Sequence, residues 1–236
     1  MYHDVCHENA SESGLASDLY KVNVSDFREQ IKIIAEYIKK DNSIILTFDD
    51  GGSSFYNPIV DILDEFGLKG IFFVATNFIN KTGFLSDLQL RMLEERGHII
   101  GSHSHSHPEN ISSLSEEEIM NEWLISLKKL NDILGHKVSI ASIPNGYESK
   151  LVLKYAEQVG IKDLYTSKPT TQLFRYKKMR IHGRYVVLSN TGVDGIMGIC
   201  NSKAYRMKQY WKWVILSILK LILGDKYENA KQFFFK

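Results

Sequence analysis

Cysteine is scarce in this sequence. Cys6 and Cys200 are the only two cysteines, and they lie near opposite ends of the chain. A pair so placed provides neither a disulfide framework nor a Cys-x-x-Cys zinc motif. The scarcity fits a protein of a reducing compartment, where thiols stay free.

The chain also lacks an excess of charge of either sign. Lys and Arg number 29 and Asp and Glu number 28, so the formal net charge is +1. Domains that bind nucleic acid usually carry a basic excess, so nucleic acid is not expected as a partner. The hydrophobic share of 44% is ordinary for a globular protein, and 236 residues are enough for one large domain.

Long hydrophobic runs are missing as well. The segment 1–9 has neither a basic nor an apolar signal-peptide region, so we expect a cytoplasmic protein. The longest apolar stretch, 211–223, contains Lys212 and Lys220 and is too short to span a bilayer. We interpret it as part of a helix of about 205–223 that closes the fold. The alternative is membrane association through this helix, with Trp and Lys at the level of the lipid headgroups.

Short apolar runs alternate with amphipathic patterns along the chain. Ser25 or Asp26 is the expected cap of the first helix, and capping boxes are expected at Ser86–Gln89 and Ser115–Glu118. The alternation predicts a parallel sheet covered by helices, either a barrel or an open doubly wound sheet, in one domain over residues 1–236. The predicted strands are 2–5, 44–48, 70–75, 98–102, 138–143, 162–166 and 184–188, and the predicted helices are 26–38, 58–66, 86–97, 115–134, 149–159 and 205–223.

Two adjacent carboxylates, Asp49 and Asp50, follow the apolar run 44–48 and precede two glycines. Close carboxylates at the end of a buried strand repel each other and resist desolvation, so a bound cation is the expected compensation. In sheets of this kind functional residues gather at the C-terminal ends of the strands, which is where this pair lies.

Three of the eight histidines lie within residues 103–107, also after a predicted strand. His103 and His107 are four residues apart, so we expect them on one side of a helical turn with His105 on the other. Two imidazoles and a carboxylate, for which Asp50 is the natural candidate, make an open three-ligand site for zinc or a similar divalent ion. The alternative is a solvated loop of His and Ser without a metal, and the neighbouring acidic pair favours the metal.

Together these motifs resemble those of the polysaccharide deacetylase family, the enzymes with a NodB homology domain. Residues 47–51 (TFDDG) match the first family motif and residues 103–108 (HSHSHP) match the second. The resemblance implies an α/β fold, a distorted (β/α)7-type barrel, with a motif core over about residues 44–190. It also implies a metal-dependent hydrolase that removes N-acetyl groups from an amino sugar in a poly- or oligosaccharide and releases acetate.

The resemblance also implies roles for individual residues. Asp49 matches the catalytic base, and Asp50, His103 and His107 match the metal ligands. Zn²⁺ is the expected metal, with Co²⁺, Ni²⁺ or Mn²⁺ as alternatives. The third family motif corresponds to residues 142–146, and it implies an oxyanion and substrate site at Pro144, Asn145 and Gly146, with a backbone N–H near Asn145 as the donor.

The third motif departs from the family pattern, because its usual Arg, which pairs with the base, is Ser142 here. We predict that Arg180 replaces it as the partner of Asp49. His182 is the predicted general acid that protonates the leaving amine. The alternative interpretation of this segment is a solvated basic patch.

Other functions remain open on the same scaffold. One is an O-acetyl esterase or another amide deacylase, because the metal machinery does not choose the leaving group. A second is a catalytically weak, metal-containing glycan-binding protein, which the missing Arg of the third motif favours. The expected partner is an acetylated glycan substrate.

Overall fold

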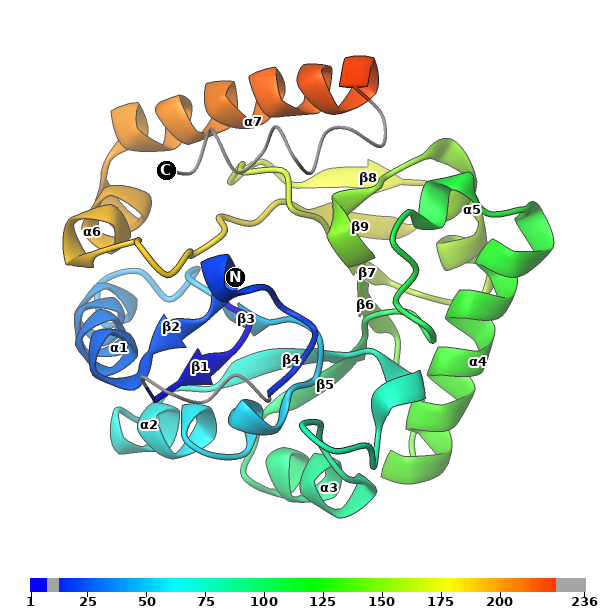
Figure 1. The fold of residues 1–236 in the computed structure, drawn as a ribbon, viewed down its shortest axis with the longest axis horizontal. Helices are drawn as coiled ribbons and strands as arrows, with labels where there is room; N and C mark the ends of the chain where they lie inside the picture. Colours follow the sequence, from blue (N-terminus) through cyan, green and yellow to red (C-terminus); the bar gives the residue numbers. More distant parts are fainter. Residues whose placement is uncertain (8–12, 224–236) are drawn as a thin grey trace.

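The computed structural model describes residues 1–7 and 13–223, and its centre is one curled sheet (Figure 1). The strand order is β3-β4-β5-β6-β7-β9-β8, and every neighbouring pair is parallel except β8 and β9. The strands are β3 (Leu46–Phe48), β4 (Gly70–Val74), β5 (Ile99–Ser102), β6 (Ile140–Ser142), β7 (Asp163–Tyr165), β8 (Phe174–Tyr176) and β9 (Met179–His182).

Helices surround this sheet, and a small parallel sheet of β1 (Val5–Cys6) and β2 (Val22–Asn23) lies beyond β3 (Figure 1). Tyr2 pairs with Phe48, which joins the start of the chain to β3. The α-helices are α1 (Val24–Ile38), α2 (Ile59–Glu65), α3 (Asp87–Glu95), α4 (Glu116–Leu134), α5 (Lys150–Gln158), α6 (Val193–Asn201) and α7 (Lys203–Leu223), and the 3₁₀ turns are Asp18–Tyr20, Ser53–Phe55, Thr76–Phe78, Ile111–Ser113 and Pro144–Gly146.

Local sequence signals explain where the helices begin and end. Both predicted capping boxes form, at the start of α3 and at the start of α4. Helix α4 ends at Gly135, whose φ of 77° is a left-handed conformation that glycine adopts without strain. The predicted cap of α1 was wrong, because the side chain of Asn23 accepts the Ser25 N–H and caps the helix.

The chain after β7 differs from the prediction. Residues 184–188 are not a strand; the sheet ends instead with the antiparallel pair β8 and β9. Gly183 explains the departure of the chain from β9, because a Cβ there would lie 2.5 Å from the Lys168 carbonyl oxygen. The close approach of these two backbone segments turns residues 184–188 away from the sheet. Helix α6 was not predicted either.

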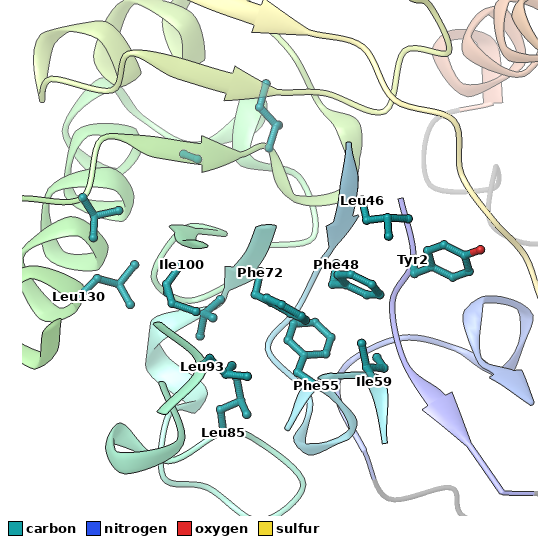
Figure 2. Close-up of a cluster of buried hydrophobic side chains, with 14 of the residues drawn as sticks. Tyr2, Leu46, Phe48, Phe55, Ile59, Phe72, Leu85, Leu93, Ile100 and Leu130 are labelled. Atoms are coloured by element: carbon teal, nitrogen blue, oxygen red, sulfur yellow. The ribbon is translucent and has the colours of Figure 1, made fainter. Parts of the chain in front are cut away.

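The main core lies between the outer face of the sheet and the helices. Phe48 and Phe72 stack with ring centroids 4.7 Å apart, and Phe55 lies 5.1 Å from Phe72 (Figure 2). Because successive side chains of a strand point to opposite faces, Thr47 and the following Asp49 point to the inner face. Trp123 on α4 is fully buried and belongs to this core.

Candidate metal centre and active site

The acidic pair lies where β3 ends and the chain turns under strain. Asp50 has a φ of 87°, and Gly51 follows with a φ of 90°. Left-handed backbone costs a non-glycine residue roughly 1–3 kcal/mol and persists only where the surroundings enforce it. The Leu85 N–H donates to the Gly51 carbonyl and the Ala75 N–H donates to the Asp50 carbonyl, which fixes this turn against neighbouring segments. Both carboxylates are buried, with 3% of each residue exposed.

The histidine loop follows β5 and is irregular rather than helical. Ser104 has a φ of 64° and His107 a φ of 56°, so the predicted helical turn was wrong. Two serine hydroxyls hold the loop instead. The Ser104 N–H donates to the Ser102 hydroxyl, and the His107 N–H donates to the Ser104 hydroxyl. The backbone turns of this loop thus bring the rings of His103 and His107 together, with ring centroids 5.0 Å apart.

Glu122 on α4 anchors the outer side of this loop. Its carboxylate accepts the backbone N–H groups of His105 and Ser106, each at 2.8 Å. The Ser106 hydroxyl donates to the other oxygen at 2.6 Å. Three hydrogen bonds to one charged group restrain a short loop strongly. Glu122 was not foreseen as part of the site, because a Glu on an amphipathic helix usually faces solvent.

Asp50, His103 and His107 bring their ligand atoms together, with all three atoms within 4.8 Å of one another. One oxygen of Asp50 lies 3.4 Å from Nε2 of His103 and 3.4 Å from Nε2 of His107. Zinc bonds of about 2.0–2.1 Å place tetrahedral ligands about 3.4 Å apart, so these separations fit a divalent ion. Two nitrogens and one oxygen also leave a coordination position for a water molecule or substrate.

The carbonyl oxygen of Ser142 fixes the tautomer of His103. Nδ1 of this ring lies 3.0 Å from the Ser142 oxygen, and a carbonyl only accepts, so Nδ1 carries the proton. Nε2 faces Asp50; in the neutral ring it carries no proton and can bind a metal, whereas in the protonated ring it donates to Asp50. Histidines that bind metals usually donate their other ring nitrogen in this way. By contrast, Nδ1 of His105 contacts the Thr76 hydroxyl at 2.9 Å, outside the three-ligand group, as predicted for this residue.

Asp49 is held by Arg184. One guanidinium nitrogen of Arg184 donates to Oδ1 at 2.6 Å and the other donates to Oδ2 at 2.8 Å. The same guanidinium donates to the Ser142 hydroxyl at 2.6 Å, and that hydroxyl donates to Asp49 at 3.2 Å. Both charged groups are buried, so this fork is little screened by solvent.

The prediction that Arg180 pairs with Asp49 is therefore wrong. Arg180 lies on β9, is about half exposed and makes a fork to Asp163 instead. Four basic residues occur between positions 177 and 184, and the sequence alone did not show which of them is buried.

His182 also lies on β9, and its Nε2 is 2.7 Å from the Asp163 carboxylate. Its ring stacks on Tyr165 at 4.5 Å. Among the described residues, no hydrogen bond joins His182 to Asp49 or to the three-ligand group. The predicted role of His182 as general acid stays a prediction.

Different neighbouring groups lower the pKa values of the two carboxylates. Burial alone would raise the pKa of Asp49, but the Arg184 guanidinium and the nearby His103 lower it to about 2. For Asp50 burial is again opposed, here by hydrogen bonds from His103 and His107, and its pKa falls well below the usual range. Burial lowers the pKa of His103, but Asp49 and Asp50 raise it further than burial lowers it. Both acids therefore stay ionised at neutral pH.

The predicted oxyanion segment, Pro144 to Gly146, forms a 3₁₀ turn directly after β6 and Ile143. Asn145 has a φ of 54°, and its side-chain amide donates to the backbone carbonyl of Glu109 at 3.2 Å. This bond places the turn beside the segment that follows His107. Pro144 is buried. The donor role of the segment stays a prediction.

Comparisons with known proteins agree with this fold and these motifs. The sequence profile named polysaccharide deacetylase matches residues 36–164. A chitin deacetylase of Arthroderma benhamiae is 44% identical over 93 residues, which cover 39% of this chain and 23% of the relative. The peptidoglycan-N-acetylglucosamine deacetylase PgdA of Listeria monocytogenes is 33% identical over 155 residues, or 65% of this chain and 31% of PgdA. The chain thus spans only a quarter to a third of the length of these relatives.

A solved structure shares the fold over most of the chain. The Streptococcus pyogenes deacetylase PplD, solved in complex with acetate, superposes with a TM-score of 0.68 at 19% identity, over 85% of this chain and 96% of PplD. This likeness confirms the predicted α/β barrel of the distorted (β/α)7 type. At such identity it establishes the fold, and the roles of individual residues rest on the geometry given above.

Proposed function

Because the chain belongs to the polysaccharide deacetylase family, we propose that it is a metal-dependent hydrolase that removes N-acetyl groups from an amino sugar of an oligo- or polysaccharide. One observation carries the proposal. An Asp-His-His donor set, of which Asp50 and His103 are buried, lies next to a second carboxylate that a buried arginine keeps ionised, with Oδ2 of Asp49 only 3.7 Å from Nε2 of His103. The names of the relatives, which include chitin and peptidoglycan deacetylases, support an acetylated amino sugar as the substrate.

Asp50, His103 and His107 would hold the metal, and zinc suits a set of two imidazoles and one carboxylate. A bound divalent cation supplies Lewis-acid chemistry: it polarises an amide carbonyl and lowers the pKa of water toward neutrality. Co²⁺, Ni²⁺ and Mn²⁺ accept the same donor atoms and are the alternatives to test.

Asp49 is the proton acceptor in this mechanism. Its carboxylate does not need to bind the metal, because Arg184 already compensates its charge. The fork from Arg184 also fixes both oxygens, so the carboxylate presents the same edge to the site in each turnover. Water forms a bond to the amide carbon as Asp49 takes its proton, and collapse of the tetrahedral intermediate then breaks the carbon–nitrogen bond, which leaves acetate and a free amine. An acid, for which His182 is the candidate, protonates that amine.

The oxyanion of the tetrahedral intermediate needs a donor, and a backbone N–H of the turn 144–146 is the candidate. This turn follows β6, whose last residue, Ser142, contacts both His103 and Asp49. A donor of this kind typically contributes about 2.7–4 kcal/mol to the stability of the transition state.

The catalytically weak glycan-binding protein loses its main support. That alternative was favoured by the missing arginine of the third motif, which would have paired with Asp49. Arg184, which lies outside the three motifs, makes this pair instead. An O-acetyl esterase uses the same machinery, so the assay includes O-acetylated as well as N-acetylated glycans.

The test combines acetate release with metal analysis for Asp49→Asn. We expect the variant to keep the metal content of the wild type and to lose activity by about 10²–10⁴-fold, since proton transfer contributes this much. Asp41→Asn is the matched control, because Asp41 is exposed and its oxygen accepts the Ser43 N–H, as an asparagine oxygen can. Full activity of Asp49→Asn on N-acetylated oligosaccharides, or no acetate release by the metal-loaded wild type, would refute the proposal.

A further inference from the structure

Helix α7 carries apolar side chains on the side that faces solvent. Met207, Trp211, Ile215 and Ile218, which we call the α7 stripe, are exposed by 46%, 57%, 53% and 51%. At about 100° per residue these four positions fall within an arc of about 80°. A surface helix usually turns such a stripe toward the core. Within residues 203–219, no residue of α7 is buried.

Contacts on the opposite side fix the orientation of the helix. Trp213 lies under the Lys168 ammonium at 5.8 Å, and the same ammonium lies 4.7 Å from the ring centre of Phe174 on β8. Arg206 donates to the carbonyl oxygens of Ile199 and Cys200 at 3.0 and 3.3 Å. Helix α7 is thus attached along the edge of the molecule at α6 and β8 (Figure 1). The helix runs from α6 toward β8 as a partly exposed helix, and the interpretation that it closes the fold stays a prediction.

Charge surrounds the stripe. Lys203 and Lys208 are exposed and lie on its two sides, at about 80° and 60° from Trp211 around the helix. The whole helix, residues 203–223, has five Lys or Arg and no Asp or Glu. A two-fold dimer through this face would bring two copies of the same cationic surface together, which like charges oppose. An anionic surface with an apolar interior complements both the lysines and the stripe.

We propose that the α7 stripe docks on the surface of an anionic lipid bilayer. Trp211 would lie at the headgroup level, where its amphipathic ring is favoured, and Ile215 and Ile218 would enter the acyl boundary. Lys203 and Lys208 would contact the anionic headgroups. Among the described residues no helix has the length and hydropathy to cross a bilayer. The docking does not depend on the reaction proposed above.

A short path of contacts joins the anchored side of α7 to the site. The Lys168 carbonyl accepts the backbone N–H of Arg184 at 2.9 Å, and Arg184 holds Asp49. The anchor of α7 and the partner of the proposed base are therefore joined by one hydrogen bond.

The experiment is co-sedimentation of the full chain with vesicles of phosphatidylcholine alone or mixed with phosphatidylserine, at low and high ionic strength. We expect binding to the anionic vesicles that weakens in salt. Trp211→Ser with Ile215→Ser should weaken it by about tenfold or more, since each side chain loses its burial in lipid. Lys203→Gln with Lys208→Gln should weaken it by about 25-fold on anionic vesicles, because each of the two lysines near such a surface contributes about a factor of five.

Leu88→Ser with Leu124→Ser is the matched control, because these leucines are exposed by 60% and 49% on other helices. Circular dichroism and acetate release confirm that each variant is folded. The proposal is overturned if the wild type does not bind anionic vesicles, or if the stripe variant or the lysine variant binds as well as the control. It is also overturned if light scattering finds a dimer that the stripe variant abolishes while vesicle binding is unchanged.

Discussion

Arg184 and Asp49 are 135 positions apart in the sequence and form a buried two-point ion pair, with N–O distances of 2.6 and 2.8 Å. The pair joins the loop after β9 to the end of β3, and so connects two strands that are far apart in the strand order. A guanidinium fork matches a carboxylate better than any other side chain does. It fixes the position of Asp49 and supplies the charge that keeps it ionised.

The first prediction follows from this pair. Arg184→Gln should lower kcat/KM by about 10²-fold or more, because it leaves the Asp49 carboxylate buried without its counter-charge and raises the pKa of that group. Arg184→Lys should be intermediate, since a lysine restores the charge but not the fork. The measurement is steady-state acetate release together with the thermal unfolding midpoint, which separates a positioning defect from loss of the fold.

Arg180→Gln is the control for this experiment. Arg180 pairs with Asp163 at a half-exposed position, where ion pairs contribute little, so its loss should change kcat/KM by less than about threefold. Equal losses in Arg180→Gln and Arg184→Gln would contradict the assignment of Arg184 as the partner of Asp49.

The second prediction concerns the metal. His107→Ala removes one of three ligands and should lower metal affinity by more than about 100-fold, because even the loss of a residue that only supports a ligand costs 10–100-fold. Affinity is measured by competition with a chromophoric chelator. His105→Ala should keep the affinity within a few fold, since His105 contacts Thr76 rather than the donor set. A loss of affinity in His105→Ala as large as that in His107→Ala would show that the ligands were assigned to the wrong histidines.

The sequence was informative where function depends on residues that are close together in the chain. The acids 49 and 50 and the histidines 103 and 107 were recognised from short motifs, and the structure brings Asp50 and the two histidines together. The reason given for the histidine pair was nevertheless wrong. A spacing of four residues suggested a helix, but left-handed residues at 104 and 107 produce the same convergence through turns.

Contacts between segments that are distant in the chain could not be predicted from the sequence. Arg180 and Arg184 are alike in type and neighbourhood, and only the curl of the sheet decides which one is buried beside Asp49. Glu122 was missed for a similar reason, because its role depends on the path of a loop 16 and 17 residues away. The strands β3 to β7, which are set mainly by local apolar runs, were predicted to within two residues at each end, whereas β8 and β9 were not predicted.

Helix α6 was missed for a local reason. Gly192, Gly195 and Gly198 lie in or beside it, and glycine lowers helix propensity by about 1 kcal/mol relative to alanine. The structure shows what glycine provides at position 198. A Cβ there would lie 2.6 Å from the ring of Tyr205, so glycine lets the start of α7 pack against α6. A tertiary contact thus outweighs a local preference, and the contact could not be read from the sequence.

The last prediction concerns stability at the opposite, N-terminal edge of the sheet. His98 precedes β5, its side chain is fully buried, and its Nδ1 accepts the Gly70 N–H at 3.2 Å. Burial, assisted by Lys69, lowers its pKa to about 4. The unfolded chain takes up this proton near the ordinary pKa of about 6.5. The stabilising contribution is therefore complete above about pH 6.5 and is lost progressively as the pH falls toward 4.

His98→Asn should keep an acceptor for the Gly70 N–H and remove this titration. Between pH 7 and pH 5 its thermal midpoint should fall less than that of the wild type, by about 2–4 °C for a difference of about 1 kcal/mol. His136→Asn serves as a control of opposite sign. The hydrogen bond to Glu94 raises the pKa of His136, so its stabilising contribution is present at low pH and is lost as the pH rises. Removing His136 should therefore make the fall between pH 7 and pH 5 steeper. Parallel pH profiles for the wild type and His98→Asn would show that His98 does not become protonated on unfolding in this range.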